Sequence, residues 1–255
     1  RQDILDGDSH QQIAAIWEWM KEGRQARTPR GLVRKPMELL ASNEAVMLRR
    51  SYPGIGKRGI GVGYPSQVNV AFDAEQMRMA MLWKGRFIDP SGVWRSQGHG
   101  RVRPLARNQT QFHPGPELDD AQKPWVVDDS RPPNHRFKGY ELDELRRPKL
   151  QYQFEHVSVE DYAVDVPDTD KPTLLRTITL RSRSPRAGMT FRLAPKGAVV
   201  KQADNAFAIG EDLVVQVRGS QNVSLAKTEL GSQIQIAIDL KASEAFVIEL
   251  EYQWK

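Results

Sequence analysis

Short stretches in which apolar and polar residues alternate dominate this chain. The clearest are QIQIAIDL at 233–240 and AFVIELEYQW at 245–254, where the alternation hardly breaks. A period of two is typical of a strand that buries one face and leaves the other in water. We therefore expect each of these segments to be a strand with one buried face.

Similar segments follow one another through the second half of the chain, separated by polar turns such as DELRRP and PDTDKP. They recur about every 8–12 residues, a spacing typical of an all-β sandwich or barrel. The predicted strands are 137–142, 148–154, 157–164, 174–181, 189–193, 198–201, 206–209, 213–218, 223–227, 233–240 and 245–254. We predict a mainly β fold, an antiparallel β-sandwich or the larger supersandwich, with one short N-terminal helix.

In the first half, the stretch 60–94 holds the densest apolar alternation. Strands are predicted at 60–64, at 67–73 and along 77–83, where Met and Trp fall on every second position. The stretch 36–52 predicts two more short strands around a turn at SNE.

The helix is predicted in QQIAAIWEWMKEG. Ile13, Ile16, Trp17 and Met20 lie at i, i+3, i+4 and i+7 and form one apolar stripe. The basic stretch that follows is interrupted by proline and glycine, which indicates an extended connector. The predicted organisation is a helix at 1–23, a linker at 24–36 and a β-sandwich domain at 37–255.

Composition excludes several classes of site. The chain has no cysteine, so disulfides, thiolate metal sites and covalently attached haem are excluded within it. Its five histidines do not fall in HxxxH or HxH spacing, so we expect no preformed metal site built from histidines. No run approaches the roughly 18 apolar residues of a membrane span, so we expect no transmembrane segment.

The formal charge of +5 comes from basic residues mixed with acidic ones. Without an aromatic stacking motif, no nucleic-acid partner is expected.

Gly54, Gly56 and Gly59 spell GxGxxG, the fingerprint of dinucleotide-binding loops. That fingerprint needs a helix after its last glycine, so that the pyrophosphate meets a helix N-terminus. Here the residues after Gly59 predict a strand. We interpret the glycines as part of a hairpin turn.

The region 95–134 is the longest irregular part of the chain and is rich in glycine, proline and charge. Long loops of this kind often carry function. Aromatic rings there can stack on the apolar faces of sugars, and the cationic side chains can hold polar groups. The candidate ligand-binding residues are Trp94, His99, Arg101, His113 and Trp125.

The sequence also offers two kinds of catalytic residue pair. One is a carboxylate–imidazole pair that acts as acid and base. The candidates, which share the irregular region, are His99, His113 and His135 with Asp119, Asp120, Asp128 and Asp129. Two carboxylates about 5–10 Å apart can act as in glycosidases, and the candidates for such a pair are Asp73, Asp89, Glu117 and Asp119. Ordinary loop and framework positions account for the same residues. We therefore assign no catalytic residue, no cofactor and no metal site within this chain.

Three stretches resemble parts of one family. DSHQQIAAIWEWMKEG (8–23) resembles the final helix of a class I c-type cytochrome, where an aromatic residue packs near the haem. RGIGVGYPSQVNVAFDAEQMRMAMLWKGRFIDPSGVW (58–94) and HRFKGYELDELRRPKLQYQFEHVSVEDY (135–162) resemble the region after that cytochrome module in large, multidomain, secreted c-type cytochromes of the planctomycete type. The matching positions are Arg58, Gly63, Tyr64, Pro65, Asn69, Ala71, Phe72, Asp73, Trp83, Gly85, Phe87, Asp89 and Trp94.

The resemblance implies a periplasmic or secreted location and no catalytic residue in this region. It also implies that 1–23 is the C-terminal helix remnant of a cytochrome c-like module, with Trp17 and Met20 packing toward the haem module. The chain lacks the CxxCH attachment motif. We therefore expect haem c to belong to an upstream module of the parent protein, before Arg1.

These observations favour a non-catalytic accessory module that docks an extracytoplasmic c-type cytochrome protein, involved in electron transfer, to a partner. The expected partner is the upstream cytochrome c module or a redox protein. One alternative is a carbohydrate-binding or carbohydrate-active β-sandwich that uses the loops at 95–134, with a polysaccharide as partner. Another is a structural module that assembles with itself.

Overall fold

The computed structural model describes residues 13–14, 17–18, 20–21, 37–94, 100–125, 130–167, 169–219 and 221–255. The chain divides into two compact units, Arg1–Pro36 and Met37–Lys255. In the first unit the described residues are helical and lie where the helix is predicted. The predicted linker at 24–36 lies outside the described residues. No helix in the described part of the chain has the length and apolar character needed to cross a membrane.

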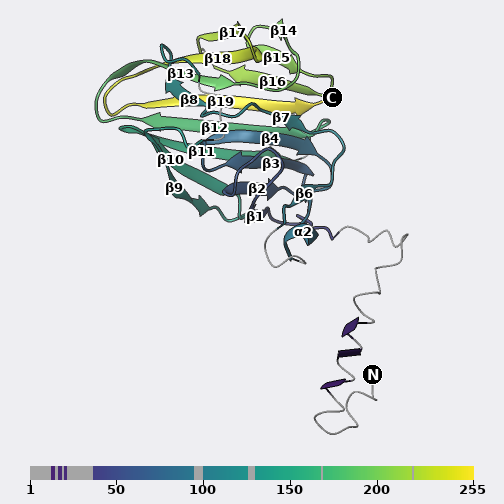
Figure 1. Cartoon of the computed structure of the whole chain (residues 1–255). Helices are drawn as coiled ribbons and strands as arrows, with labels where there is room; N and C mark the ends of the chain where they lie inside the picture. The colour runs from purple at the N-terminus through teal and green to yellow at the C-terminus, as the bar shows by residue number, and fades with distance from the viewer. Residues whose placement is uncertain are drawn as a thin grey trace. The chain divides into compact units, whose positions relative to one another are not determined.

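The largest sheet of the second unit has eight strands (Figure 1). Their spatial order is β14 (Val199–Ala203), β15 (Ala206–Ile209), β16 (Leu213–Arg218), β19 (Ala245–Trp254), β12 (Thr173–Arg181), β11 (Val157–Val166), β10 (Pro148–Phe154) and β9 (His135–Leu142). All neighbours are antiparallel. The C-terminal strand β19 therefore lies inside the sheet, between β16 and β12.

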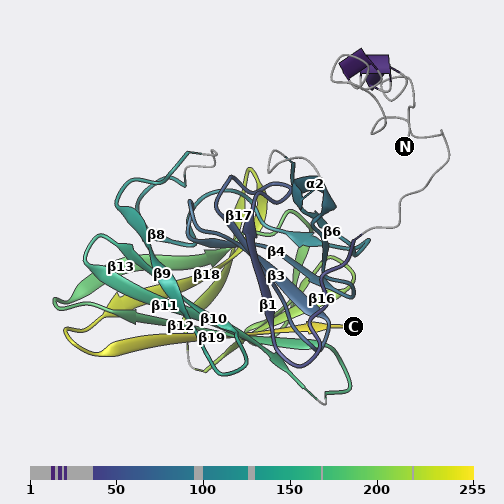
Figure 2. The same ribbon diagram turned by 90° about the horizontal axis from the view of Figure 1, so that it is seen from below.

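Two further sheets face this one. The five-stranded sheet contains β1 (Val46–Arg50), β2 (Gly59–Gly63), β3 (Val68–Asp73), β4 (Arg78–Lys84) and β7 (Thr110–Gln111). The four-stranded sheet contains, in spatial order, β17 (Val223–Thr228), β18 (Gly231–Leu240), β13 (Arg186–Leu193) and β8 (Leu118–Asp120). Figure 2 shows these two sheets beside each other, and a backbone bond from His113 N to Ala194 O (2.7 Å) joins them. A small pair, β5 (Ile88–Asp89) and β6 (Arg103–Pro104), and the short helix α2 (Ser91–Trp94) complete the described elements.

The predicted antiparallel β-sandwich is confirmed. Each strand predicted between 137 and 254 is present, and four have the predicted bounds, namely β10, β15, β16 and β19. In β18 and β19 the buried positions alternate with more exposed ones over most of their length, as the period of two predicts. Predicted strands at 60–64, 67–73 and 77–83 correspond to β2, β3 and β4.

Two expectations from the first half need correction. The stretch 36–52 forms one strand, β1, because Leu39 pairs instead with Ile88 through a single isolated bridge. The region 95–134 contains three short strands, β6, β7 and β8, each of which pairs with a longer-range partner. Strands of two or three residues are too short to show alternation, which is why the sequence suggests only loops there.

Buried side chains from all three larger sheets form one continuous core. The ring of Phe72 lies 5.8 Å from the ring of Tyr152, centroid to centroid, and the Tyr64 hydroxyl donates to Ala163 O at 2.7 Å. The five-stranded sheet thus packs on the part of the large sheet that contains β10 and β11. Its other face carries a second core cluster around Trp83 and Tyr52. Strands β2 and β3 are therefore buried on both faces.

Two glycines allow that double burial in β2. A Cβ on Gly61 would overlap the hydroxyl end of the Tyr52 ring, and one on Gly63 would lie 2.6 Å from Cγ of Phe87. Both aromatic rings lie directly on the strand. The glycines that interrupt the apolar run at 60–64 are therefore sites of close aromatic packing.

A fully buried ion cluster joins the two layers. Arg176 on β12 donates from Nε and Nη2 to Asp161 on β11 (2.8 and 2.6 Å), and from Nη1 and Nη2 to Glu117 (3.0 and 2.5 Å). Glu117 precedes β8 and also accepts the backbone N–H of Met79 on β4 at 3.1 Å. Burial raises the pKa of Glu117, and the cation of Arg176 opposes that shift. One arginine thus connects strands of three sheets.

Candidate binding pocket

The candidate pocket lies on the face of the four-stranded sheet that turns away from the core. On β13, Met189, Phe191 and Leu193 belong to the core, so Thr190 and Arg192 project from the opposite face. On β18, the isoleucines at 234, 236 and 238 are core residues, and the glutamines at 233 and 235 share the face of Arg192. Arg192 and Gln235 are direct partners across the two strands.

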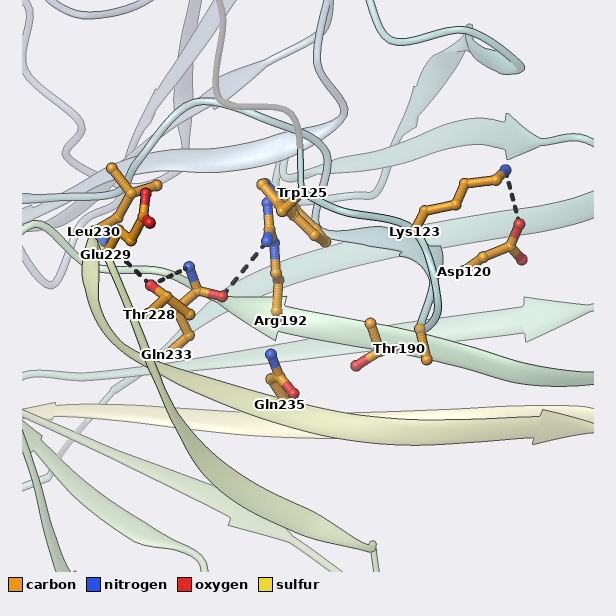
Figure 3. A pocket seen from close by; sticks show the side chains of 11 residues that line it. Asp120, Lys123, Trp125, Thr190, Arg192, Thr228, Glu229, Leu230, Gln233 and Gln235 are labelled. Atoms are coloured by element: carbon orange, nitrogen blue, oxygen red, sulfur yellow. Dashed lines mark hydrogen bonds and ion pairs between the residues drawn. The ribbon is translucent and has the colours of Figure 1, made fainter.

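The pocket has a volume of about 500 Å³. Three segments line it: the end of β8 with the turn after it, the strand β13, and the hairpin formed by β17 and β18 (Figure 3). The lining residues are Asp120, Ala121, Lys123, Trp125, Thr190, Arg192, Thr228, Glu229, Leu230, Gln233 and Gln235. The turn after β8 is held over the sheet because Ala121 N donates to Gly188 O at 2.9 Å.

Arg192 is the central side chain of the pocket and is only 3% exposed. Its Nη1 donates to Oε1 of Gln233 at 3.4 Å, and its Nε and Nη2 have no hydrogen-bond partner. The Gln233 amide is oriented from its other end, because its Nε2 donates to Oγ1 of Thr228 at 3.2 Å. Figure 3 shows this chain of contacts along the floor of the pocket.

Electrostatics reflect this burial. Desolvation lowers the pKa of Arg192, and the carboxylates of Asp119 and Glu117 oppose the shift from a distance. A guanidinium keeps its charge at neutral pH because its intrinsic pKa is above about 12. Within the described part of the chain, this buried cation therefore has no counter-charge in contact.

Trp125 covers this cation. Its indole ring lies against the guanidinium of Arg192, as Figure 3 shows. Its Nε1 is also buried without a partner. Within the described residues, five buried side-chain atoms lack a partner, and three of them belong to this Trp–Arg pair. Buried polar atoms are normally satisfied, so their concentration at one place marks a site.

The remaining charges at the pocket are paired or exposed. Asp120 accepts from Lys123 at 2.7 Å and from Arg186 at 2.5 Å. Burial alone would raise the pKa of Asp120, but these two hydrogen bonds outweigh it and lower the pKa. Glu229 lies exposed on the turn between β17 and β18.

The structure brings two of the sequence-predicted binding residues together. Trp125 lines the pocket, and the half-buried His113 bonds to the backbone of Leu230, another lining residue. Burial lowers the pKa of His113, and the cations of Lys196 and Arg192 lower it further.

The other predicted residues lie elsewhere. Trp94 ends α2 and is 51% exposed. Arg101 lies beside the same helix, since the carbonyl oxygen of Arg101 would be 2.5 Å from a Cβ on Gly92. Neither lines the pocket. His99 lies outside the described residues. In the first unit, Trp17 and Met20 are 58% and 43% exposed.

Sequence reasoning missed Arg192, Thr190 and the two glutamines. A signal was present, because polar residues occupy every second position in the strands 189–193 and 233–240. Such positions normally face water, and only the turn after β8 converts them into a pocket floor.

The acidic residues considered as a catalytic pair have structural partners. Asp73 Oδ1 accepts the N–H of Glu75 (3.0 Å) within its turn, and Asp89 accepts the N–H of Ser91 (2.9 Å) at the start of α2. Glu117 belongs to the Arg176 cluster. The remaining candidate, Asp119, accepts the N–H of Asp120 at 2.8 Å. In each case these hydrogen bonds give the carboxylate a structural role.

No family model matches the chain, and no curated protein sequence matches it. Among solved structures, the chain is similar to one described as "Putative kojibiose phosphorylase from human microbiome", with 9% sequence identity and a TM-score of 0.40. The match covers 85% of this chain and 29% of that chain, so this chain spans less than a third of the phosphorylase's length.

Proposed function

We propose that the β-sandwich is a non-catalytic saccharide-binding module whose site is the pocket on the four-stranded sheet. The observation that supports this most is the combination of an indole, two amides and two hydroxyls around one pocket of about 500 Å³. Ligand sites of this size pair an apolar or aromatic surface with a few oriented polar groups. Sugars present an apolar ring face and a rim of hydroxyls, and both match this lining.

The rigidity of the site also supports binding. Thr190, Gln233 and Gln235 are on paired strands, and Gln233 is oriented by Thr228. Side chains that are already ordered lose little entropy when a ligand binds. Side-chain amides and hydroxyls both donate and accept hydrogen bonds, as sugar hydroxyls do.

The test is isothermal titration calorimetry with a panel of soluble plant, algal and bacterial polysaccharides. We expect Trp125→Ala to weaken binding at least about tenfold, which corresponds to about 1.4 kcal/mol. Trp94→Ala is the matched control, since Trp94 is exposed but outside the pocket, and it should bind as the unchanged chain does. The proposal fails if no polysaccharide binds, or if Trp94→Ala and not Trp125→Ala removes binding.

A second function is favoured by the first unit. Ile13, Trp17 and Met20 form the predicted stripe, and they are 56%, 58% and 43% exposed. An exposed apolar stripe on a helix is suited to packing on a partner. Together with the sequence resemblance, this supports docking to a c-type cytochrome module in a periplasmic or secreted protein, with haem c held by that module.

Surface plasmon resonance with an immobilised c-type cytochrome would test the docking function. We expect the double change Trp17→Ser and Met20→Ser to remove binding, because it makes the stripe polar. Lys21→Ser is the control on the same helix. Equal binding by the double variant and the unchanged chain would exclude this stripe as the docking surface.

A further inference from the structure

We infer that the ligand of the pocket is an anionic saccharide, with a carboxylate or sulfate group that binds the free edge of Arg192. This inference rests on the proposed saccharide-binding function and specifies its ligand class. The buried arginines of the fold differ in their hydrogen-bond partners, and this difference supports the inference.

Three arginines in the described residues are at most 3% exposed: Arg78, Arg176 and Arg192. The guanidinium of Arg78 reaches the side chains of Gln76 and Asp73 and the carbonyl oxygens of Phe112 and Gly54. The guanidinium of Arg176 makes four charged hydrogen bonds. Arg192 makes one hydrogen bond, to an uncharged amide. The fold satisfies two buried arginines and leaves the third for another partner.

The two unpaired nitrogens are the matching pair for an oxyanion. Nε and Nη2 form one edge of the planar guanidinium, and their N–H bonds run in parallel toward the two oxygens of a carboxylate. The same edge of Arg176 holds Asp161 in this way, at 2.8 and 2.6 Å. Because Gln233 occupies the opposite edge of Arg192 through Nη1, the guanidinium is already oriented for a ligand.

Among the described residues around the pocket, no carboxylate is available to fill this position. Asp120 is paired with Lys123 and Arg186, and Glu117 is paired with Arg176. Asp119 accepts from the backbone of Asp120 and lies 3.9 Å from Lys123. Glu229 is exposed to water at the rim. A buried cation without a counter-ion costs several kcal/mol in general, which favours an anion from outside.

Trp125 has a part in this recognition. Because its indole covers the guanidinium, the acidic group reaches Nε and Nη2 only when the ring moves aside. Binding thus exchanges the contact with the ring for a charged, bidentate hydrogen bond, and the displaced ring can pack on the sugar.

The test compares three oligosaccharides of similar length, titrated into the full chain at low and at physiological salt. They are an oligogalacturonide, its uncharged methyl ester and a sulfated galactan oligomer. We expect an anionic oligomer to bind at least tenfold more tightly than the methyl ester, and the two charged probes separate carboxylate from sulfate. Arg192→Gln should remove the preference, because it removes the charge that distinguishes the acid from its ester. Arg136→Gln, which removes an exposed arginine on β9, should leave the preference intact.

The outcomes separate the two levels of the proposal. Equal binding of charged and uncharged oligomers overturns the anionic ligand but leaves the saccharide-binding function standing. A preference that survives in Arg192→Gln also overturns the inference, and the melting temperature of that variant shows whether it is folded. Absence of binding by all three probes and by the polysaccharide panel overturns both.

Discussion

Replacing Arg192 by methionine should make the protein more stable, whereas the same change at Arg176 should make it much less stable. Both side chains are almost fully buried, and both lie against an aromatic ring, that of Trp125 or of Phe191. They differ in their partners. Arg176 contacts two carboxylates, and Arg192 contacts one amide.

The magnitudes follow from those partners. Removing an uncompensated buried charge relieves about 3–5 kcal/mol. Loss of the attraction between the cation and the neighbouring indole costs at most about 1–2 kcal/mol, and the freed Oε1 of Gln233 costs about 1 kcal/mol. Methionine keeps most of the side-chain volume, so the net expectation for Arg192→Met is a gain of about 1 kcal/mol. Arg176→Met leaves Glu117 and Asp161 buried without their cation and should cost about 3–5 kcal/mol.

Urea unfolding followed by tryptophan fluorescence and by circular dichroism measures both changes. A gain of about 1 kcal/mol corresponds to about 2–4 °C in the melting temperature of a domain of this size. If Arg192→Met loses more than about 1 kcal/mol, Arg192 holds the structure together, and the reasoning that it awaits a ligand is wrong. The Arg176 variant is the positive control. Its expected loss of stability shows that the assay detects the removal of an arginine that has structural partners.

Two further predictions concern stability. Burial acts to raise the pKa of Asp143, but hydrogen bonds from Tyr162 and Arg147 outweigh it and lower the pKa. Its contribution to folding is therefore present above the unfolded pKa and lost as the pH falls through the folded pKa, so Asp143→Asn should flatten the loss of stability below about pH 4 in acid titrations. Gly61→Ala should destabilise the domain by about 1–3 kcal/mol through overlap with the Tyr52 ring, and Tyr52→Ala should cost less in that background than in the unchanged chain. A simple sum of the two changes in urea unfolding would contradict that contact.

The sequence predicts much of the second half of the sandwich because the strands there are long enough to show clean alternation, even where, as in β19, the partner strands are distant. It predicts less well where the paired segments are very short. Leu39 pairs with Ile88 through a single bridge, and β8, which pairs with β13, has only three residues, too few to show a period of two. The double burial of β3 also departs from simple alternation, because a second layer around Trp83 covers its other face.

The candidate pocket, too, is only partly predictable from the sequence. Trp125 could be proposed from its residue type and its place in an irregular, charged region. Arg192 could not, because an arginine between core positions of a strand looks like a solvent-facing residue. Its burial depends on the turn after β8, and its lack of a partner depends on where Asp120 and Glu117 find theirs.

The position of β19 has a consequence for how the protein is made. This strand is synthesised after both of its neighbours, yet it lies between β16 and β12 in the middle of the largest sheet. Until it arrives, β12 and β16 each present an unpaired edge, and exposed strand edges invite pairing with other chains. Folding of the large sheet must therefore wait for synthesis of β19, and a chain that is cut before residue 245 should aggregate instead of forming a smaller sandwich.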